Sequence, residues 1–178
     1  VALKTLTNSQ NLNQEFLKEL TLYKMFKSEV SNMVPCYGIS KDPEGNYIMV
    51  MKYMEKGNLR DYLRKRDYFS LEDKFRLLKH IIQGLKDIHR KKLVHRDFHS
   101  GNIIVDVINE GGHDEENVCR ITDLGLSKLA DEKDNSQVYG VMPYMAPEVL
   151  RGEPYTQKSD VYSLGMIMYE IVTDLPPF

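Results

Sequence analysis

Four short motifs follow one another along the chain, and their combination restricts the fold more than any other feature of the sequence. They are Val-Ala-Leu-Lys at residues 1–4, His-Arg-Asp-Phe-His-Ser-Gly-Asn at 95–102, Asp-Leu-Gly at 123–125 and Ala-Pro-Glu at 146–148. Taken singly, a strand with an exposed lysine and a turn such as Asp-Leu-Gly are both common structural features. Chance would bring all four together in this order in well under ~1% of sequences. The ordered set is therefore a far more specific signal than any one of the motifs.

The first half of the chain alternates predicted strands with one helix. Strands are predicted at residues 1–6, 33–39 and 47–51, the last being a continuous apolar run suited to a buried strand. Apolar residues at helical spacing predict the helix between the first two strands: Leu12, Phe16, Leu20 and Tyr23. Glu19 falls on or beside this apolar stripe, where a carboxylate is costly to bury unless a cation meets it.

Two further helices are predicted in the middle of the chain. The first is a short charged helix at residues 59–65, after the break at Gly57-Asn58. The second begins with the cap signature Ser-Leu-Glu-Asp at 70–73 and closes on the basic residues 90–92. Its apolar series keeps a three/four rhythm for nearly five turns: Leu71, Phe75, Leu78, Ile82, Leu85 and Ile88.

The rest of the chain is predicted to contain a hairpin, a long irregular stretch and a last helix. Residues 103–107 and 118–122 are expected to pair across an acidic glycine turn, and the irregular stretch runs from 123 to about 154. The last helix is expected to start near Ser159-Asp160, and its apolar series is Val161, Leu164, Met168, Ile171 and Leu175.

Composition excludes several classes of function. Lys and Arg number 24 against 26 Asp and Glu, a net charge of −2, which argues against a broad basic face for nucleic acid or anionic lipid. No apolar run approaches the ~20 residues that a membrane helix needs. Cys36 and Cys119 lie far apart without metal-ligand spacing, and we expect two reduced thiols. A cytoplasmic location is the default expectation, because no targeting pattern is present.

The ordered motifs resemble those of the eukaryotic protein kinases, and the resemblance covers the whole chain. The segments 144–148 and 159–165 add to it. The chain looks most like the tyrosine-kinase-like group, and residues 140–144 are similar to kinases of the kind expanded in mycorrhizal fungi. The resemblance implies an α+β, two-lobed fold, with a small lobe of antiparallel strands plus one helix and a mainly helical large lobe.

The resemblance also implies an incomplete domain. It assigns residues 1–54 to a partial small lobe with the hinge, and 55–178 to a partial large lobe. No Gly-x-Gly-x-x-Gly occurs in the sequence, although the family places this loop before the strand that carries Lys4. Kinases continue with further helices, one of which supplies an arginine for the residue that matches Glu148.

As a member of this family, the chain would transfer the γ-phosphate of ATP to a protein hydroxyl. Lys4 would bind the α- and β-phosphates and pair with Glu19, which would explain the carboxylate on an apolar helical face. Asn102 and Asp123 would supply hard oxygen ligands for Mg²⁺. Asp97 would orient the acceptor hydroxyl and take its proton.

Other positions match the family through packing or backbone contacts. Met51 matches the gatekeeper, and Lys52, Tyr53 and Met54 match the hinge, where backbone groups at Met54 would face adenine. The stacked column that links the two lobes would consist of His95, Leu124, Tyr23 and Cys36. For Met51 and Met54, and for the column residues, plain core packing is the alternative interpretation.

Asp160 has two interpretations. Near a helix start it is typical of an N-cap, whereas the resemblance gives it the role of holding the catalytic loop through backbone N–H groups.

Substrate choice and regulation depend on departures from the family pattern. His99 and Val141 stand where Ser/Thr kinases often carry Lys and Thr, so a Ser/Thr acceptor rests on the group resemblance alone and Tyr stays open. Arg96 would receive a phosphate on the activation segment. The candidate acceptors, which are otherwise exposed loop hydroxyls, are Ser127, Ser136 and Tyr139.

Two alternative functions stand beside the kinase. One is a catalytically inactive, kinase-like binding or scaffold module. The other is a small-molecule phosphotransferase, which the Ala-Pro-Glu segment disfavours because in protein kinases it shapes a peptide site.

Overall fold

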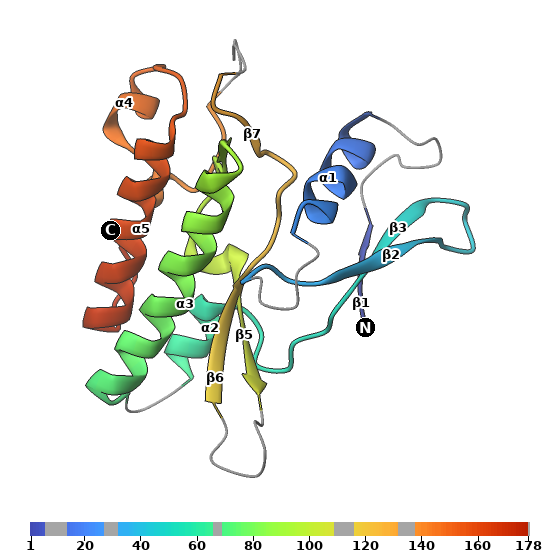
Figure 1. Cartoon of the computed structure of the whole chain (residues 1–178). Helices are drawn as coiled ribbons and strands as arrows, with labels where there is room; N and C mark the ends of the chain where they lie inside the picture. Colours follow the sequence, from blue (N-terminus) through green and yellow to red (C-terminus); the bar gives the residue numbers. More distant parts are fainter. Residues whose placement is uncertain (6–13, 27–31, 66–68, 109–115, 132–137, 178) are drawn as a thin grey trace.

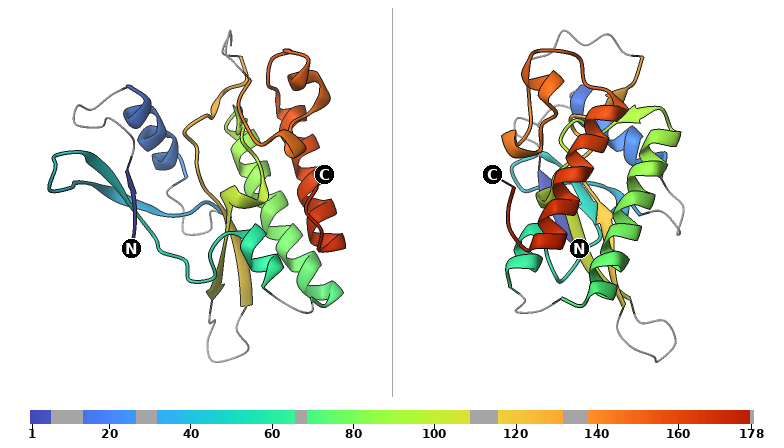
Figure 2. Two further views of the ribbon diagram at one scale, coloured as in Figure 1. Left: turned by 180° about the vertical axis from the view of Figure 1, so that it is seen from behind. Right: turned by 90° about the vertical axis from the view of Figure 1, so that its left-hand side faces the viewer.

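The computed structural model describes residues 1–5, 14–26, 32–65, 69–108, 116–131 and 138–177. In this part of the chain the elements form two lobes. Three strands and one helix lie on one side, two long helices lie on the other, and a hairpin stands between them (Figures 1 and 2). The predicted α+β, two-lobed kinase-like architecture is confirmed.

The small lobe contains a three-stranded antiparallel sheet in the order β1 (Ala2–Thr5), β3 (Tyr47–Met51) and β2 (Cys36–Lys41). The apolar run of β3 takes the central position, as expected for a strand flanked on both sides. Along β1 the side chains alternate, so that Lys4 is half-buried while Leu3 is exposed.

The strand predicted at residues 33–39 begins later, at Cys36. Met33 instead forms an isolated parallel bridge to Ile121, and the backbone N–H of Val34 donates to the Ile121 carbonyl at 2.9 Å. The apolar residues before β2 thus connect the small lobe to the large one rather than extending the sheet.

Helix α1 (Gln14–Lys24) belongs to the small lobe (Figure 1). Its buried face includes Phe16, Glu19 and Tyr23, which confirms the predicted spacing with a carboxylate on it. Leu12, the first residue of the predicted stripe, lies outside the described residues.

The large lobe consists of α2 (Leu59–Arg64), α3 (Leu71–Arg90), the antiparallel hairpin of β5 (Ile103–Ile108) and β6 (Glu116–Ile121), and α5 (Gln157–Thr173). Smaller elements connect them: β4 (Leu93–Val94) paired with β7 (Lys128–Leu129), the turns η1 (Ser100–Asn102) and η2 (Met142–Tyr144), and α4 (Pro147–Leu150). No helix in the described part of the chain is long and apolar enough to cross a membrane. The two cysteines are free thiols, as expected.

The predicted buried face of α3 is partly wrong. The capping box of Ser70 and Asp73 is present, but Leu71 and Phe75 are 68% and 62% exposed. The residues that bury are Leu77, Leu78, Ile81, Gly84, Leu85 and Ile88. Two adjacent stripes of this helix are apolar, and packing against β6 and α5 selects one of them.

The predicted buried face of α5 is wrong in a more informative way. Thr156 is the N-cap and the helix starts at Gln157, so Asp160 lies inside the helix and the N-cap interpretation of Asp160 fails. Val161 and Met168 are exposed. Four of the six residues on the buried face are polar: Ser159, Asp160, Ser163, Ile167, Glu170 and Ile171. Two of these polar residues, Asp160 and Glu170, bind groups of the candidate active site.

Candidate active site

The structure brings Lys4, Glu19 and Asp123 together from three separate elements. The Lys4 ammonium on β1 donates to Glu19 Oε1 on α1 at 2.6 Å and to Asp123 Oδ1, just after β6, at 2.8 Å. Glu19 is 1% exposed. A carboxylate this deep needs a cation, so the apolar-face position of Glu19 and its pairing with Lys4 have one physical cause.

The electrostatics keep Lys4 charged. Burial acts to lower the pKa of Lys4, but the two adjacent carboxylates outweigh it and hold that pKa above its ordinary value. Gly125 closes over the pair: a Cβ there would lie 3.3 Å from both Asp123 Oδ1 and Glu19 Oε2. A side chain at 125 would therefore press on both carboxylates, which would have to shift by a few tenths of an ångström.

Asp160 anchors the loop that carries Asp97. Its carboxylate accepts from the backbone N–H groups of His95 at 2.8 Å and Arg96 at 3.0 Å, and contacts His89 Nε2 at 2.9 Å. Arg96 has a φ of 74°, which belongs to the sparsely populated left-handed region. Because this carboxylate binds two successive N–H groups, it can stabilise that conformation, which agrees with the role that the resemblance gave it.

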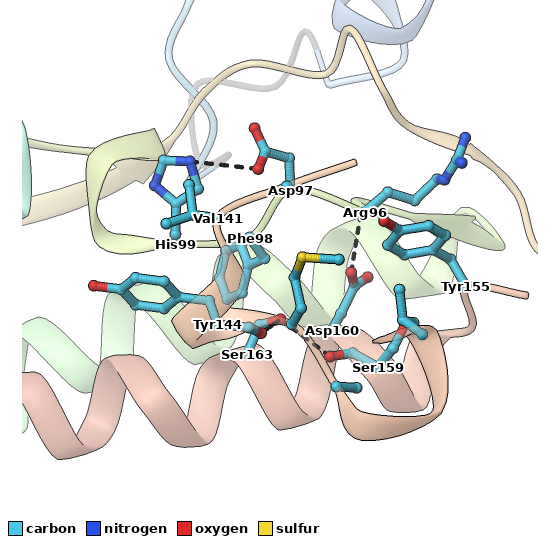
Figure 3. Close-up of a pocket in the computed structure, with 14 residues that line it drawn as sticks. Arg96, Asp97, Phe98, His99, Val141, Tyr144, Tyr155, Ser159, Asp160 and Ser163 are labelled. Carbon is cyan, nitrogen blue, oxygen red and sulfur yellow. Dashed lines mark hydrogen bonds and ion pairs between the residues drawn. The ribbon is translucent and has the colours of Figure 1, made fainter. Parts of the chain in front are cut away.

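Asp97 and Asn102 lie against each other. The Asn102 side-chain amide donates to the Asp97 carbonyl at 2.9 Å and to Asp97 Oδ2 at 3.1 Å. On the other side, His99 Nε2 lies 3.5 Å from Asp97 Oδ1, as Figure 3 shows. Burial acts to raise the pKa of Asp97, but the neighbouring His99 and His95 rings and the Asn102 amide outweigh it and hold that pKa below its ordinary range, so the group is a carboxylate near neutral pH.

A short chain of hydrogen bonds joins this loop to α1. His95 Nε2 lies 3.1 Å from the Thr122 carbonyl, Thr122 Oγ1 lies 3.1 Å from the Tyr23 hydroxyl, and that hydroxyl accepts from the Asp123 N–H at 2.9 Å. Burial lowers the pKa of His95, so its ring is neutral and Nε2 donates to the carbonyl. Burial also raises the pKa of Tyr23 to about 12. His95 Nδ1 also accepts the backbone N–H of Asp97 at 3.3 Å, so neutral, hydrogen-bonded groups connect Asp97 with Asp123.

The column residues share one core. His95, Leu124 and Tyr23 are buried, and Cys36 packs against the same cluster while half-buried. The core-packing interpretation and the column interpretation therefore agree on burial.

The segment after β3 turns one side chain toward the large lobe. Met51 and Met54 are buried and Tyr53 is exposed. The Lys52 ammonium lies 2.5 Å from Asp106 Oδ2 on β5, while the backbone N–H of Lys52 donates to the Pro35 carbonyl. Sequence reasoning missed this ion pair, because nothing in the spacing of residues 52 and 106 links them.

The candidate phosphate acceptors differ in accessibility. Ser127 is fully buried, and its hydroxyl donates to the His95 carbonyl at 3.3 Å. In this conformation Ser127 is therefore neither an accessible phosphate acceptor nor an exposed loop hydroxyl. Tyr139 is exposed, and its N–H donates to the Tyr155 hydroxyl at 2.8 Å. Ser136 lies outside the described residues. The Arg96 guanidinium lies 4.6 Å from the Tyr155 ring centroid.

A pocket opens beside Asp97 between the loop and the segment after residue 138. Figure 3 shows Val141 next to His99 and the Tyr144 ring beneath them. The Tyr144 hydroxyl donates to Glu170 Oε2 at 2.6 Å. Sequence reasoning did not assign Tyr144 or Glu170 to the site, although a glutamate interrupting the apolar run of α5 was the available signal.

The donor chemistry fits Mg²⁺. The Asn102 amide nitrogen donates to Asp97, which leaves the amide oxygen able to act as a metal ligand. The Asp123 carboxylate stays partly exposed although its Oδ1 accepts from Lys4. In the described ranges no group of three or more His, Cys, Asp or Glu could hold a metal by itself. Two oxygen donors without a closed cage suit an ion that keeps several waters and phosphate oxygens as ligands.

Comparison with known proteins points, over the whole chain, to the family that the motifs resemble. The family model described as "Protein kinase domain" matches residues 1–178. The chain is 35% identical over 168 residues to the serine/threonine/tyrosine-protein kinase HT1 of Arabidopsis thaliana, covering 88% of this chain and 41% of that protein. It is 31% identical to the mitogen-activated protein kinase kinase kinase dlk-1 of Caenorhabditis briggsae, covering 91% of this chain and 18% of that protein.

A tyrosine kinase is also similar. The chain is 30% identical to the tyrosine-protein kinase Src64B of Drosophila melanogaster over 178 residues, which covers 97% of this chain and 30% of that protein. The chain therefore spans less than half the length of each of these curated relatives.

Proposed function

This chain belongs to the protein kinase domain family, and from that premise we propose that it transfers the γ-phosphate of ATP to a hydroxyl of a protein substrate, with Mg²⁺. The observation that carries the proposal is the convergence of Lys4, Glu19 and Asp123 at 2.6 and 2.8 Å. The backbone links this cluster to Asn102, whose carbonyl accepts from the Thr122 N–H at 3.0 Å.

Some of these residues supply charge for phosphoryl transfer, and others hold the reacting groups in position. Lys4 binds the α- and β-phosphates as a point charge, and Glu19 holds the ammonium in place. Asn102 and Asp123 hold the metal. When bound, Mg²⁺ neutralises negative charge on the phosphate oxygens. Asp97 hydrogen-bonds the acceptor hydroxyl and takes its proton as the hydroxyl oxygen attacks the γ-phosphorus of ATP. The bond between the γ-phosphorus and the β-phosphate oxygen breaks, and ADP leaves.

We propose Ser or Thr as the acceptor. The similarity to the serine/threonine/tyrosine-protein kinase HT1 supports this choice, and the similarity to Src64B makes Tyr the alternative that must be tested. Phosphoamino acid analysis of a generic protein substrate separates the two. Label found only on Tyr would contradict the proposed acceptor while leaving the kinase assignment intact.

The Lys4→Met variant tests the transfer reaction itself. Methionine has nearly the length of the lysine stem but no charge, so it leaves Glu19 and Asp123 without their cation and the phosphates without theirs. We expect transfer from labelled ATP to a generic protein to fall by about 10²-fold or more. The exposed Lys41→Met serves as the matched control and should transfer at the wild-type rate. Equal labelling by the wild type and Lys4→Met would favour a binding module over a kinase.

The Asp123→Asn variant tests the proposed metal ligand. Wild-type protein should show a higher melting temperature with Mg²⁺ and ATP than with ATP and a chelator, because a ligand that binds only the folded state stabilises it. In Asp123→Asn the Mg²⁺-dependent part of that increase should disappear. If it persists unchanged, Asp123 does not hold the metal.

A further inference from the structure

Helix α2, which packs against η1, carries a basic face. Arg60 and Arg64 are four residues apart, so they lie on the same face of this helix. From residue 59 to residue 65 the basic side chains are Arg60, Arg64 and Lys65, and the acidic one is Asp61. Asp61 is engaged at the start of the helix, where it accepts from the Asn58 side-chain amide at 2.8 Å. The face that Arg60 and Arg64 share is therefore positively charged.

Arg60 is held against the loop that follows Asp97. Its Nε–H donates to Ser100 Oγ at 3.3 Å, and its Cζ lies 5.7 Å from the centroid of the Tyr144 ring. A Cβ at Gly101 would lie 3.9 Å from the same Cζ. The side chain is only half-buried, so a ligand can reach it. Because Arg60 is fixed before a ligand arrives, it loses little side-chain freedom on binding one.

The charge of Arg60 has no counter-charge in direct contact. Glu170 is buried and accepts from the Tyr144 hydroxyl at 2.6 Å, but it forms no ion pair with Arg60. Among the described residues neither Arg60 nor Arg64 forms an ion pair with a carboxylate. Three other arginines do pair with acidic neighbours: Arg76, Arg90 and Arg151. A cation fixed beside the loop of Asp97 without a counter-charge favours an anionic group on the ligand.

The contacts that lead from Arg60 to Asp97 are short. The Cβ position at Gly101 lies 3.9 Å from Arg60 Cζ and 2.8 Å from His99 Nδ1. His99 Nε2 in turn lies 3.5 Å from Asp97 Oδ1 (Figure 3). An extended peptide spans about 3.3–3.6 Å per residue. A substrate whose hydroxyl lies at Asp97 can therefore place a side chain against Arg60 from two to four residues away.

We propose that Arg60 and Arg64 select acidic protein substrates, with Arg60 binding an aspartate or glutamate two to four residues from the acceptor hydroxyl. The proposal rests on the proposed kinase activity, because that activity places the acceptor at Asp97. Arg64 is exposed and lies one helical turn further along α2, about 5.4 Å, so it adds a weaker, long-range attraction for the same acidic segment. Both arginines act on the protein substrate, so they change its KM and leave the KM for ATP unchanged.

Peptide pairs test the proposal on the unchanged protein. Each pair carries Asp or Asn at one position, two to four residues before or after the acceptor that phosphoamino acid analysis identifies. We expect at least one Asp peptide to have a KM about threefold to tenfold below that of its Asn partner, because carboxylates bind arginine more strongly than amides do. The preference should shrink between about 0.05 M and about 0.5 M salt, since salt screens exposed charges. Asp and Asn peptides with KM values within about twofold of each other at every position would overturn the proposal.

Two variants assign the preference to α2. Arg60→Gln keeps an N–H donor for Ser100 but removes the charge, so the KM of the preferred Asp peptide should rise to that of its Asn partner. The KM values for ATP and for the Asn peptide should stay within about twofold of wild type. Arg64→Glu reverses the charge at an exposed position and should raise the KM of the Asp peptide by about twofold to fivefold. The matched control is Arg90→Gln on α3, where the side chain is 64% exposed, and it should change none of these values.

The outcomes separate recognition from folding. If Arg60→Gln does not fold by circular dichroism, Arg64→Glu and the peptide pairs decide the matter. A preference for Asp that is as large in both variants as in the wild type would overturn the assignment to Arg60 and Arg64.

Peptide binding, measured by fluorescence anisotropy, distinguishes this proposal from the proposed function. A wild-type protein that transfers phosphate but binds the Asp and Asn peptides equally would reject the acidic preference alone. A wild-type protein that transfers no phosphate, yet binds the Asp peptide more tightly and loses this preference in Arg60→Gln, would reject the proposed function and retain α2 as a binding site for acidic peptides.

Discussion

Asp97→Asn should lower kcat for phosphate transfer by about 10²–10⁴-fold, the contribution typical of a positioned general base. The asparagine oxygen can still accept from the Asn102 amide, which holds the side chain at 3.1 Å in the wild type, so the shape of the loop is retained. What is lost is an oxygen that can take a proton. The measurement is single-turnover transfer of labelled phosphate to a generic protein at saturating ATP.

The same experiment needs a control for the loss of one negative charge. Asp131→Asn removes an exposed carboxylate and should transfer phosphate at the wild-type rate. ATP binding to Asp97→Asn, measured by thermal shift, should match ATP binding to the wild type. The reason is that no hydrogen bond among the described residues joins Asp97 to Lys4 or Glu19. Undiminished kcat in Asp97→Asn would remove Asp97 from the chemistry.

Asp160→Asn should reduce the free energy of unfolding by about 2–4 kcal/mol, a large share of a domain's net stability. The Asp160 carboxylate is 2% exposed and accepts from the N–H groups of His95 and Arg96, while also contacting His89. An amide has one acceptor oxygen, so its NH₂ group must face at least one of these donors, which leaves buried groups unsatisfied. Urea unfolding followed by circular dichroism measures the change.

Asp160→Asn should also disturb the conformation of the loop that carries Asp97, in addition to lowering the free energy of unfolding. Arg96 adopts its φ of 74° next to the two N–H groups that Asp160 binds, so losing that acceptor releases the backbone that carries Asp97. We expect Asp160→Asn to lose transfer activity even at temperatures where it is folded. Asp131→Asn again provides the comparison, with a change in unfolding free energy below about 0.5 kcal/mol. A loss for Asp160→Asn no larger than this control would show that the loop holds its shape without the anchor.

The ion pair between Lys4 and Glu19 illustrates how far sequence reasoning reached. Periodicity placed Glu19 on an apolar helical face, and the cost of burying a lone carboxylate required a cation. The resemblance named Lys4 as that cation. The structure adds Asp123 as a second partner at 2.8 Å, with Gly125 closing over both carboxylates. No argument from spacing alone connects residues that lie 119 positions apart.

Helices α3 and α5 show where periodicity misleads. Each was assigned the stripe richest in large apolar side chains, yet Phe75 and Val161 are exposed. In α5 the buried positions include Asp160 and Glu170, whose partners are loop N–H groups and the Tyr144 hydroxyl. A hydropathy pattern counts such residues as surface, because it has no knowledge of partners that come from other segments.

By itself the sequence determined the antiparallel hairpin and the helix cap at Ser70, because each of these depends on local spacing or on residue type, and it carried the motifs whose resemblance to the protein kinases named the site residues. Only the tertiary structure decided which face of α3 and α5 is buried, that Ser127 is inaccessible, and that Lys52 pairs with Asp106. These features depend on contacts between segments far apart in the chain, and the free energy of such contacts is set by the partner that packing supplies.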